Sequence, residues 1–524
     1  MRLIPVLLFI CASLQAQNPE FDILITGGKV VDGSGSFWYY ADLGIRGDTI
    51  AAIGPLSGHT ARVNIDADGQ VVAPGFIDIH THSRRGILEH PEAENYIRQG
   101  VTTLIEGNDG SSPVPLAPFF NKLQQIPIAV NFASFVGQGT VRQEVMGLVA
   151  RKATAEEIAK MKALVEQAMH DGAFGMSTGL FYVPGNFTPI EEVIELAKVA
   201  GKLGGMHISH MRDEGAKVSK SVEETIRIGE DGDLPTQVTH HKIMGAESWG
   251  KSKETLALIE SARARGVDVT VDAYPYTASS TGTAALFPQL ALEGGQKALL
   301  ERLNAPDRRA QIKTEIQRRL EFDRGGGDPK NVVMASCGFD HTLDGKSLAD
   351  ITRQQRRPVN FETAAETAIE IQSKGGCSAI YHAISEDDVE RILRYPFTMV
   401  ASDGEIPTMG VGVPHPRSYG TFARVLGRYV RERKTITLED AVRKMSGLPA
   451  TRLRMLDRGL LRLGMKADVV IFDPSMVADR AEFDKPHQYA VGFKWVIVNG
   501  KTVIDDGKLT AARPGRVLYG PAKQ

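Results

Sequence analysis

The stretch Val72-Ala-Pro-Gly-Phe-Ile-Asp-Ile-His-Thr-His82 is the most informative part of the chain. Its mostly apolar run from Phe76 to Ile79 is typical of a buried parallel strand, and His80 and His82 close that strand. Side chains two residues apart on a strand point to the same side, so both imidazoles can bind one metal ion. In a parallel α/β barrel, this carboxyl end of the strands is where the chemistry takes place.

Candidate strands and helices alternate along most of the chain. A helix is expected over 154–170, where Thr154 is the N-cap and Glu157 completes a capping box, and another over 189–203. Strands that alternate with helices predict an α/β fold, here a (β/α)8 metal-dependent hydrolase barrel over residues 74–460. The eight expected strands are 76–82, 101–106, 127–134, 173–177, 204–210, 235–241, 267–273 and 397–403.

Both ends of the chain carry short β-rich pieces separated by glycines. Residues 22–73 and 461–524 share this character, and Asn499-Gly500 is a strong hairpin signal. We therefore expect the two ends to form one small β-sandwich. The gap before the last candidate strand is too long for one helical crossover, which predicts an inserted subdomain near the barrel mouth over roughly 283–375. Gly325–Gly327 is expected to be a flexible point within it.

Residues 1–16 resemble a secretory signal peptide. Arg2 provides the positive start, Leu3 to Ala12 is an apolar run, and Ala16 offers a small residue for cleavage. The apolar run is too short for a permanent anchor, and no later segment is long and apolar enough to span a bilayer. We expect a periplasmic or secreted protein with no stable membrane anchor after signal removal.

The charge balance bears on the class of partner, and the cysteine content bears on whether the chain contains a disulfide. The 61 basic and 63 acidic residues nearly balance and form no long run of one sign, which argues against nucleic acid. Cys337 and Cys377 remain once the signal is removed. A disulfide between them and two buried free thiols are both compatible with the sequence.

Three further expected strands end in side chains that bind metals. These are His210, His240 and Asp403. One histidine at the end of a strand is more often structural than a ligand. Five such residues at the same end of one barrel, counting His80 and His82, instead predict a site for zinc or a similar divalent ion.

Four neighbouring polar residues are expected to support the site or the fold rather than bind the metal. His207 and His241 face the sides of their strands opposite to His210 and His240. The other two, Asp213 and Glu214, begin a loop.

Six longer motifs resemble those of a known family. The chain from about Asp22 to its C-terminal part is similar to the amidohydrolase superfamily, and more narrowly to the D-aminoacylases, the N-acyl-D-amino-acid deacylases. The motifs are Gly175-Met-Ser-Thr-Gly-Leu-Phe-Tyr182, His210-Met-Arg-Asp-Glu-Gly215, His240-His-Lys-Ile-Met244, Tyr274-Pro-Tyr-Thr-Ala-Ser279, Ser402-Asp-Gly404 and His415-Pro-Arg-Ser-Tyr-Gly-Thr421.

The resemblance implies a role for each matched residue. Asp403 would be the catalytic aspartate and a metal ligand, and Arg417 would hold the α-carboxylate of the substrate. One or two zinc ions would be bound by the four histidines His80, His82, His210 and His240. The polar groups that help to bind substrate would be Tyr182, Tyr274, Ser280 and Lys242.

The chain departs from the family pattern at one position. The second strand of the family usually ends in Gly-Asn-Cys-Gly, whose cysteine binds zinc, whereas this chain reads Glu106-Gly-Asn-Asp-Gly110. Asp109 therefore takes the place of the cysteine. A carboxylate can bind or bridge metals, so we expect Asp109 to be a ligand, with Glu106 as a second candidate. A thiolate is softer than a carboxylate, which leaves the metal and the number of ions open.

The expected reaction is hydrolysis of the amide bond of an N-acyl-D-amino acid, a small molecule. The metal polarises the carbonyl and acidifies water, while Asp403 acts first as general base and then as general acid. The bidentate pairing of guanidinium with carboxylate suits Arg417 to a substrate with a free carboxylate. The preference for D over L rests on the resemblance alone, and the sequence leaves the oligomeric state undetermined.

Two alternatives remain. One is a dipeptidase or another amidase of the same superfamily that acts on a substrate with a free carboxylate. The other is a non-catalytic scaffold without metal, supported only by the missing cysteine.

Overall fold

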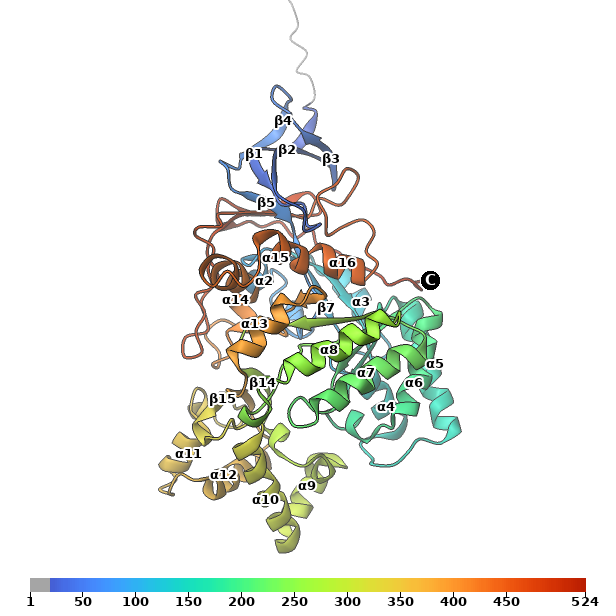
Figure 1. The fold of residues 1–524 in the computed structure, drawn as a ribbon, viewed down its shortest axis with the longest axis vertical. Helices are drawn as coiled ribbons and strands as arrows, with labels where there is room; N and C mark the ends of the chain where they lie inside the picture. Colours follow the sequence, from blue (N-terminus) through green and yellow to red (C-terminus); the bar gives the residue numbers. More distant parts are fainter. Residues whose placement is uncertain (1–18) are drawn as a thin grey trace, which may run out of the picture.

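The computed structural model describes residues 19–524, so the expected signal peptide over residues 1–16 lies outside the described part of the chain. Figure 1 shows the N-terminal strands at one end of the molecule, the strands and helices of the barrel in the middle, and a helical insertion at the opposite end. The site discussed below lies between the barrel and this insertion.

Parallel strands form the centre of the molecule, as predicted. Within residues 19–524 they form one sheet in the order β17-β13-β12-β11-β10-β9 and another in the order β6-β7-β8. The two sheets join where β8 leads into β9 and at a parallel bridge between Thr81 and Gly404. The strands are β6(Phe76–Asp78), β7(Val101–Glu106), β8(Asn131–Ser134), β9(Val136–Gly137), β10(Gly175–Gly179), β11(Met206–His210), β12(Thr236–Val238), β13(Val269–Ala273) and β17(Thr398–Val400).

Helices that connect these strands pack outside them. The two predicted helices are confirmed as α5(Ala155–Asp171) and α6(Ile190–Lys202). Thr154 caps α5 in a capping box: its hydroxyl accepts from the Glu157 N–H at 3.2 Å, and the Glu157 carboxylate accepts from the Thr154 N–H at 2.8 Å. The next helices along the barrel are α7(Val218–Gly232), α8(Ser252–Ala264) and α13(Glu386–Arg394).

The two chain ends meet, as predicted, but in one continuous hydrogen-bonded sheet rather than two separate ones. Its order in the described chain is β21-β20-β19-β18-β5-β1-β2-β3, and β4 also pairs with β1. Asn499 and Gly500, at φ 46° and 73°, form the predicted turn between β19 and β20. The strands are β1(Phe21–Val30), β2(Tyr39–Arg46), β3(Thr49–Gly54), β4(Ala61–Asp66), β5(Val71–Pro74), β18(Val469–Phe472), β19(Phe493–Val498), β20(Lys501–Asp505) and β21(Lys508–Leu509).

The insertion follows β13 and ends before α13. Three antiparallel strands connect it to the barrel, and four helices form its outer part (Figure 1). Its elements are β14(Ser279–Gly282), α9(Gly295–Asn304), α10(Pro306–Phe322), β15(Val332–Ser336), α11(Leu348–Gln354), α12(Phe361–Ser373) and β16(Ser378–Tyr381). It is therefore slightly longer than the 283–375 expected, because strands β14 and β16 at its base belong to it.

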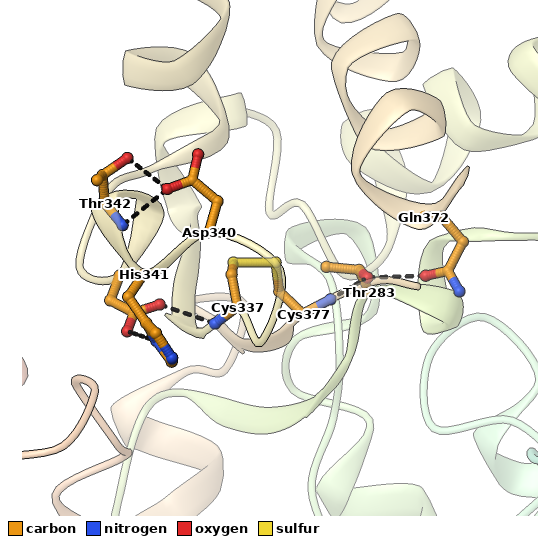
Figure 2. Close-up of a disulfide and its surroundings, with 8 residues drawn as sticks. Thr283, Cys337, Asp340, His341, Thr342, Gln372 and Cys377 are labelled. Atoms are coloured by element: carbon orange, nitrogen blue, oxygen red, sulfur yellow. Dashed lines mark hydrogen bonds and ion pairs between the residues drawn. A yellow bond between two sulfur atoms is a disulfide. The ribbon is translucent and has the colours of Figure 1, made fainter. Parts of the chain in front are cut away.

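The insertion contains two features that the sequence analysis singled out, the pair of cysteines and the glycine run 325–327. Cys337 and Cys377 form a disulfide that links the segment after β15 to the start of β16, as Figure 2 shows. Gly325–Gly327, the expected flexible point, form a hydrogen-bonded turn in which the Gly325 N–H donates to the carbonyl of Arg319 at 3.0 Å. Among the helices of residues 19–524, none combines the length and the apolar character needed to cross a membrane.

Candidate metal centre

Six predicted ligands converge at the carboxyl ends of the barrel strands. They form two groups that share Asp109, and within each group the ligand atoms lie within 4.8 Å of one another. One group is His80, His82, Asp109 and Asp403, and the other is Asp109, His210 and His240. The structure thus brings together every metal ligand that the sequence predicted, and the two groups provide two adjacent positions for a cation.

Asp109 lies between the two groups of histidines. Its Oδ1 atom is 3.4 Å from His80 Nε2 and 3.3 Å from His240 Nε2. Its Oδ2 atom is 3.4 Å from His82 Nε2 and 3.4 Å from His210 Nδ1. Each carboxylate oxygen therefore faces one imidazole from each group, so Asp109 could serve as a ligand at either position.

The backbone turns sharply at three of the ligands. Asp109, His240 and Asp403 have φ angles of 54°, 34° and 52°. This left-handed region is unfavourable for residues other than glycine, and such strain concentrates at functional sites. The turns end the strands early and direct these side chains into the barrel mouth, which explains why β12 and β17 are shorter than predicted.

Two buried atoms of the cluster fit a bound cation. His80 Nε2 and Asp109 Oδ1 have no hydrogen-bond partner among the described residues, although they lie only 3.4 Å apart. The His80 ring is oriented by its other nitrogen, because Nδ1 lies 2.7 Å from the Thr239 hydroxyl. Buried polar atoms rarely remain unpaired, and a cation bound by both atoms would satisfy them. Imidazole and carboxylate together suit zinc and related divalent ions, so these residues fit such a metal.

A second layer of charged groups orients the ligands. The Glu214 carboxylate accepts from Lys242 Nζ at 2.5 Å and lies 3.3 Å from His240 Nδ1. Burial by itself raises the pKa of Glu214, but the positive charge of Lys242 outweighs it and holds this pKa well below its usual range. Glu214 therefore stays ionised behind the histidines and orients the His240 ring.

A cavity of about 380 Å³ opens next to the metal ligands. Arg417, Tyr182 and Ser280 line it, as predicted for residues that bind substrate. The Tyr182 hydroxyl lies 3.1 Å from that of Thr281, and the carbonyl of Ser280 accepts from Arg417 at 3.4 Å. The cavity therefore has room for a small molecule beside the metal cluster.

Two predicted substrate-binding residues lie further back. Lys242 and Tyr274 are buried and are not among the described residues that line the cavity. Lys242 bonds to Glu214, as described above. The Tyr274 hydroxyl has no partner within the described chain, and the guanidinium of Arg417 lies 5.1 Å from the Tyr274 ring centre.

The four residues that were not expected to be primary ligands lie outside both metal groups. His207 is held between the hydroxyls of Thr178 and Thr236, and His241 contacts Thr255. Burial lowers the pKa of each of these histidines to about 3, so both remain neutral. The Asp213 carboxylate accepts from backbone N–H groups of its own loop. The alternative ligand Glu106 accepts from the Arg84 N–H at 2.9 Å and also lies outside the groups.

Sequence reasoning missed two residues that contact this site. Asp272 accepts from the His240 N–H at 2.7 Å, and its carboxylate lies 3.8 Å from His80 Nδ1. An acidic residue inside an expected buried strand was the signal for it. Arg324 comes from the insertion and lies 3.4 Å from Glu214, and no local sequence pattern indicates that contact.

Comparisons with known proteins agree with this geometry. The model of the amidohydrolase family matches residues 64–181 and 338–504. The chain is 39% identical to a D-aminoacylase of Alcaligenes xylosoxydans xylosoxydans, over 96% of this chain and 99% of that protein. It is 35% identical to an N-acyl-D-aspartate deacylase of the same organism, over 97% of each chain. The crystal structure of an N-acyl-D-glutamate deacylase from Bordetella bronchiseptica, complexed with zinc and a phosphonate inhibitor, has a TM-score of 0.83 at 36% identity and covers 95% of this chain and 99% of its own.

Proposed function

The chain belongs to the N-acyl-D-amino-acid deacylases of the amidohydrolase family, and we propose that it hydrolyses the amide bond of N-acyl-D-amino acids. The products are a carboxylate and a free D-amino acid. One observation carries the proposal: the buried carboxylate of Asp403 lies 3.0 Å from the metal ligand His82 and 2.6 Å from Arg417. Asp403, which can accept and donate a proton, thus lies between the proposed metal position and the guanidinium of Arg417, which can pair with the carboxylate of the substrate.

The two groups of ligands support a zinc enzyme with room for a second ion. His80, His82, Asp109 and Asp403 would hold one ion, and Asp109 with His210 and His240 would hold the other. A divalent metal supplies a Lewis acid that polarises the acyl carbonyl and lowers the pKa of water. The relative from Bordetella bronchiseptica is described as complexed with zinc.

Asp403 and Arg417 carry out the steps that belong to the protein itself. Asp403 accepts the proton of the attacking water on its carboxylate and returns it to the nitrogen of the departing amine. Arg417 binds the α-carboxylate of the substrate through two parallel N–H groups, which fixes the position of the scissile bond relative to Asp403. Lys242 and Glu214 keep the His240 ring in place while this happens.

The two alternative functions, a dipeptidase and a non-catalytic scaffold, are less well supported than the deacylase. A dipeptidase would use the same Arg417 and the same metal ligands, but the similar proteins named above are deacylases over nearly their full length. A scaffold without metal would not need six converging ligands with buried, unpaired atoms. Asp109 keeps the cluster complete where the family has cysteine.

We infer export to the periplasm or the cell exterior, with residues 1–16 as a removable signal peptide and no stable anchor afterwards. The disulfide between Cys337 and Cys377 supports this, because disulfides persist in oxidising compartments and are rare in the cytosol. The balanced charge supports a small-molecule substrate rather than nucleic acid.

A panel of N-acetyl-D- and N-acetyl-L-amino acids and D-terminal dipeptides tests the proposal. The purified protein is assayed as isolated, after treatment with a chelator, and after zinc is returned. We expect turnover of the D-compounds, loss of that turnover with the chelator, and recovery with zinc. Faster hydrolysis of the L-compounds or the dipeptides, or a protein that binds no metal, would contradict it.

A further inference from the structure

A second arginine lines the cavity beside the metal centre. Arg324 follows α10 in the insertion, is only 2% exposed, and belongs to the same cavity wall as Arg417. The proposed reaction requires one guanidinium, which holds the α-carboxylate. It gives no task to Arg324.

The contacts of Arg324 leave its charge incompletely satisfied. Its Nη2 atom lies 3.4 Å from Glu214, a long distance for a charge-assisted bond. Lys242 donates to Oε1 of Glu214 at 2.5 Å, whereas Arg324 contacts the other oxygen, Oε2, so the Lys242 ammonium is the nearer partner of this carboxylate. The Nε atom of Arg324 is buried and has no partner among the described residues. The charge of Asp323 also favours the cation, but Arg318 and Arg319 share that carboxylate.

The guanidinium of Arg324 is held in a defined position. It lies over the Phe181 ring, 4.1 Å from the ring centre. The chain then turns back through Gly325 and Gly326, where side chains have no room: an added Cβ would lie 2.1 Å from the carbonyl oxygen of Leu320 and 2.6 Å from that of His382, respectively. A rigid turn and an aromatic face thus present a buried cation to the cavity.

We propose that Arg324 binds a second carboxylate of the substrate. A buried cation with incomplete hydrogen bonds is costly, and an anion that completes them recovers part of that cost. With Arg417 on the α-carboxylate, the favoured substrates are N-acyl-D-glutamate and N-acyl-D-aspartate, or an N-acyl-D-amino acid whose acyl group ends in a carboxylate. This inference rests on the proposed deacylase function and specifies its substrate class.

The test compares pairs of substrates that differ only in the second carboxylate. The kcat/KM values are measured for N-acetyl-D-glutamate against N-acetyl-D-glutamine, and for N-succinyl-D-leucine against N-acetyl-D-leucine. A hydrogen bond to a charged group is worth roughly 1.5–3 kcal/mol, which corresponds to a preference of about 10- to 100-fold. A preference within the first pair places the carboxylate on the side chain, and one within the second places it on the acyl group.

Variants then connect the preference to Arg324. In R324Q the favoured ratio should fall to nearly one, and R324K should retain part of it, because lysine keeps the charge without the planar fork. A general loss of activity caused by the altered contact with Glu214 would lower kcat/KM for both substrates of a pair, so it would leave their ratio unchanged. The control is R318Q, which alters an exposed arginine of α10, the helix before Arg324, that pairs with Glu315. It should keep the wild-type ratio.

Two results overturn the inference while the deacylase function stands. One is a wild-type enzyme for which both ratios are near one, and the other is a preference that R324Q leaves unchanged. Failure of the proposed function is recognised separately, because the zinc-loaded protein would then hydrolyse no N-acyl-D-amino acid of the panel.

Discussion

Arg417 donates from Nη1 to Oδ2 of Asp403 at 2.6 Å, and both side chains are buried. Burial by itself raises the pKa of Asp403, but the positive charge of Arg417 outweighs it and holds this pKa well below its usual range. The base is therefore kept ionised and in place before substrate arrives. If Arg417 binds the α-carboxylate of the substrate as proposed, the guanidinium would be shared and its hold on Asp403 would weaken. The proposed mechanism thus predicts that substrate binding and proton transfer are coupled through one ion pair.

The variant D403N should fold and bind metal but lose turnover. Asparagine keeps the shape of the side chain and one oxygen for Arg417, yet it cannot take a proton from water. General acid–base catalysis contributes roughly 10²- to 10⁴-fold, so we expect kcat to fall by about 10³-fold. The measurements are kcat, metal content and thermal unfolding. A near wild-type rate with normal metal content would remove Asp403 from its role.

The variant R417A should impair mainly the hydrolysis of substrates that have a free α-carboxylate. Loss of a two-pronged charged contact should raise KM for an N-acetyl-D-amino acid by about 100-fold, the equivalent of about 2.7 kcal/mol. The corresponding α-amide should be affected far less, because it cannot form that pair. R417K should be intermediate. Equal effects on the acid and on its amide would mean that Arg417 acts through Asp403 alone.

The metal ligands could be predicted because each depends on local order along the chain. His80 and His82 are two residues apart at the end of an apolar run, and His210, His240 and Asp403 each close another expected strand. Parallel strands bring such ends together in any barrel. Asp109 is predicted through its place in a family motif, and its position between the two groups of histidines depends on the turns that the backbone makes at the site.

The remaining contacts depend on distances between segments far apart in the sequence. Arg324 reaches Glu214 only because the insertion folds back over the barrel mouth. The link between Cys337 and Cys377 requires β15 and β16 to be neighbours, and the sequence left that pairing open. The contact of Arg417 with Asp403 likewise depends on how one loop packs, which residue spacing does not specify.

Asp109 should determine which metal the site prefers. Oxygen ligands favour harder ions such as manganese, whereas thiolates favour softer ions such as cadmium. We expect D109C to raise the affinity for cadmium relative to manganese by about tenfold or more, and D109N to reduce the number of ions bound per chain. Competitive equilibrium dialysis with metal analysis measures both without an assay of activity. An unchanged ratio in D109C and an unchanged ion count in D109N would show that Asp109 binds no metal.

The disulfide should stabilise the insertion and, through it, the cavity. Cys337 and Cys377 are separated by 40 residues, and closing a loop of this length is worth roughly 4 kcal/mol in the chain-entropy model. The Cys377 N–H also donates to the Thr283 hydroxyl at 3.0 Å, next to the strand that carries Ser280 (Figure 2). We therefore expect the double variant C337S/C377S to be cleaved faster within residues 283–375 by a protease and to show a raised KM.

Reductant provides the control for this variant. It should make the wild-type protein as sensitive to the protease as the double variant and should leave the double variant unchanged. Equal cleavage rates of the oxidised wild type and the double variant would show that the bridge does not hold the insertion.

His207 should make the stability of the fold dependent on pH. Burial, together with the positive charge of Arg452, lowers its pKa to about 3, whereas an unfolded chain titrates near the ordinary value of about 6.5. Between these two values the unfolded chain binds a proton that the native state does not. The contribution of His207 to the free energy of unfolding is therefore fully present above about pH 6.5. It is lost as the pH falls toward 3, by at most about 1.4 kcal/mol per pH unit.

The variant H207Q removes this titration and can still hydrogen-bond to Thr178 and Thr236, the two partners of His207. Urea unfolding of the metal-free proteins at pH 7, 6 and 5 should show wild type losing stability faster than H207Q, so that the gap between them narrows by about 1 kcal/mol per pH unit below 6.5. Metal-free samples are used because acid would protonate the neighbouring metal ligands and release the metal. That release would lower the stability independently of His207. His341 is exposed on the insertion, so H341Q should follow the wild-type curve. Parallel curves for wild type and H207Q would show that acid destabilises this fold through other groups.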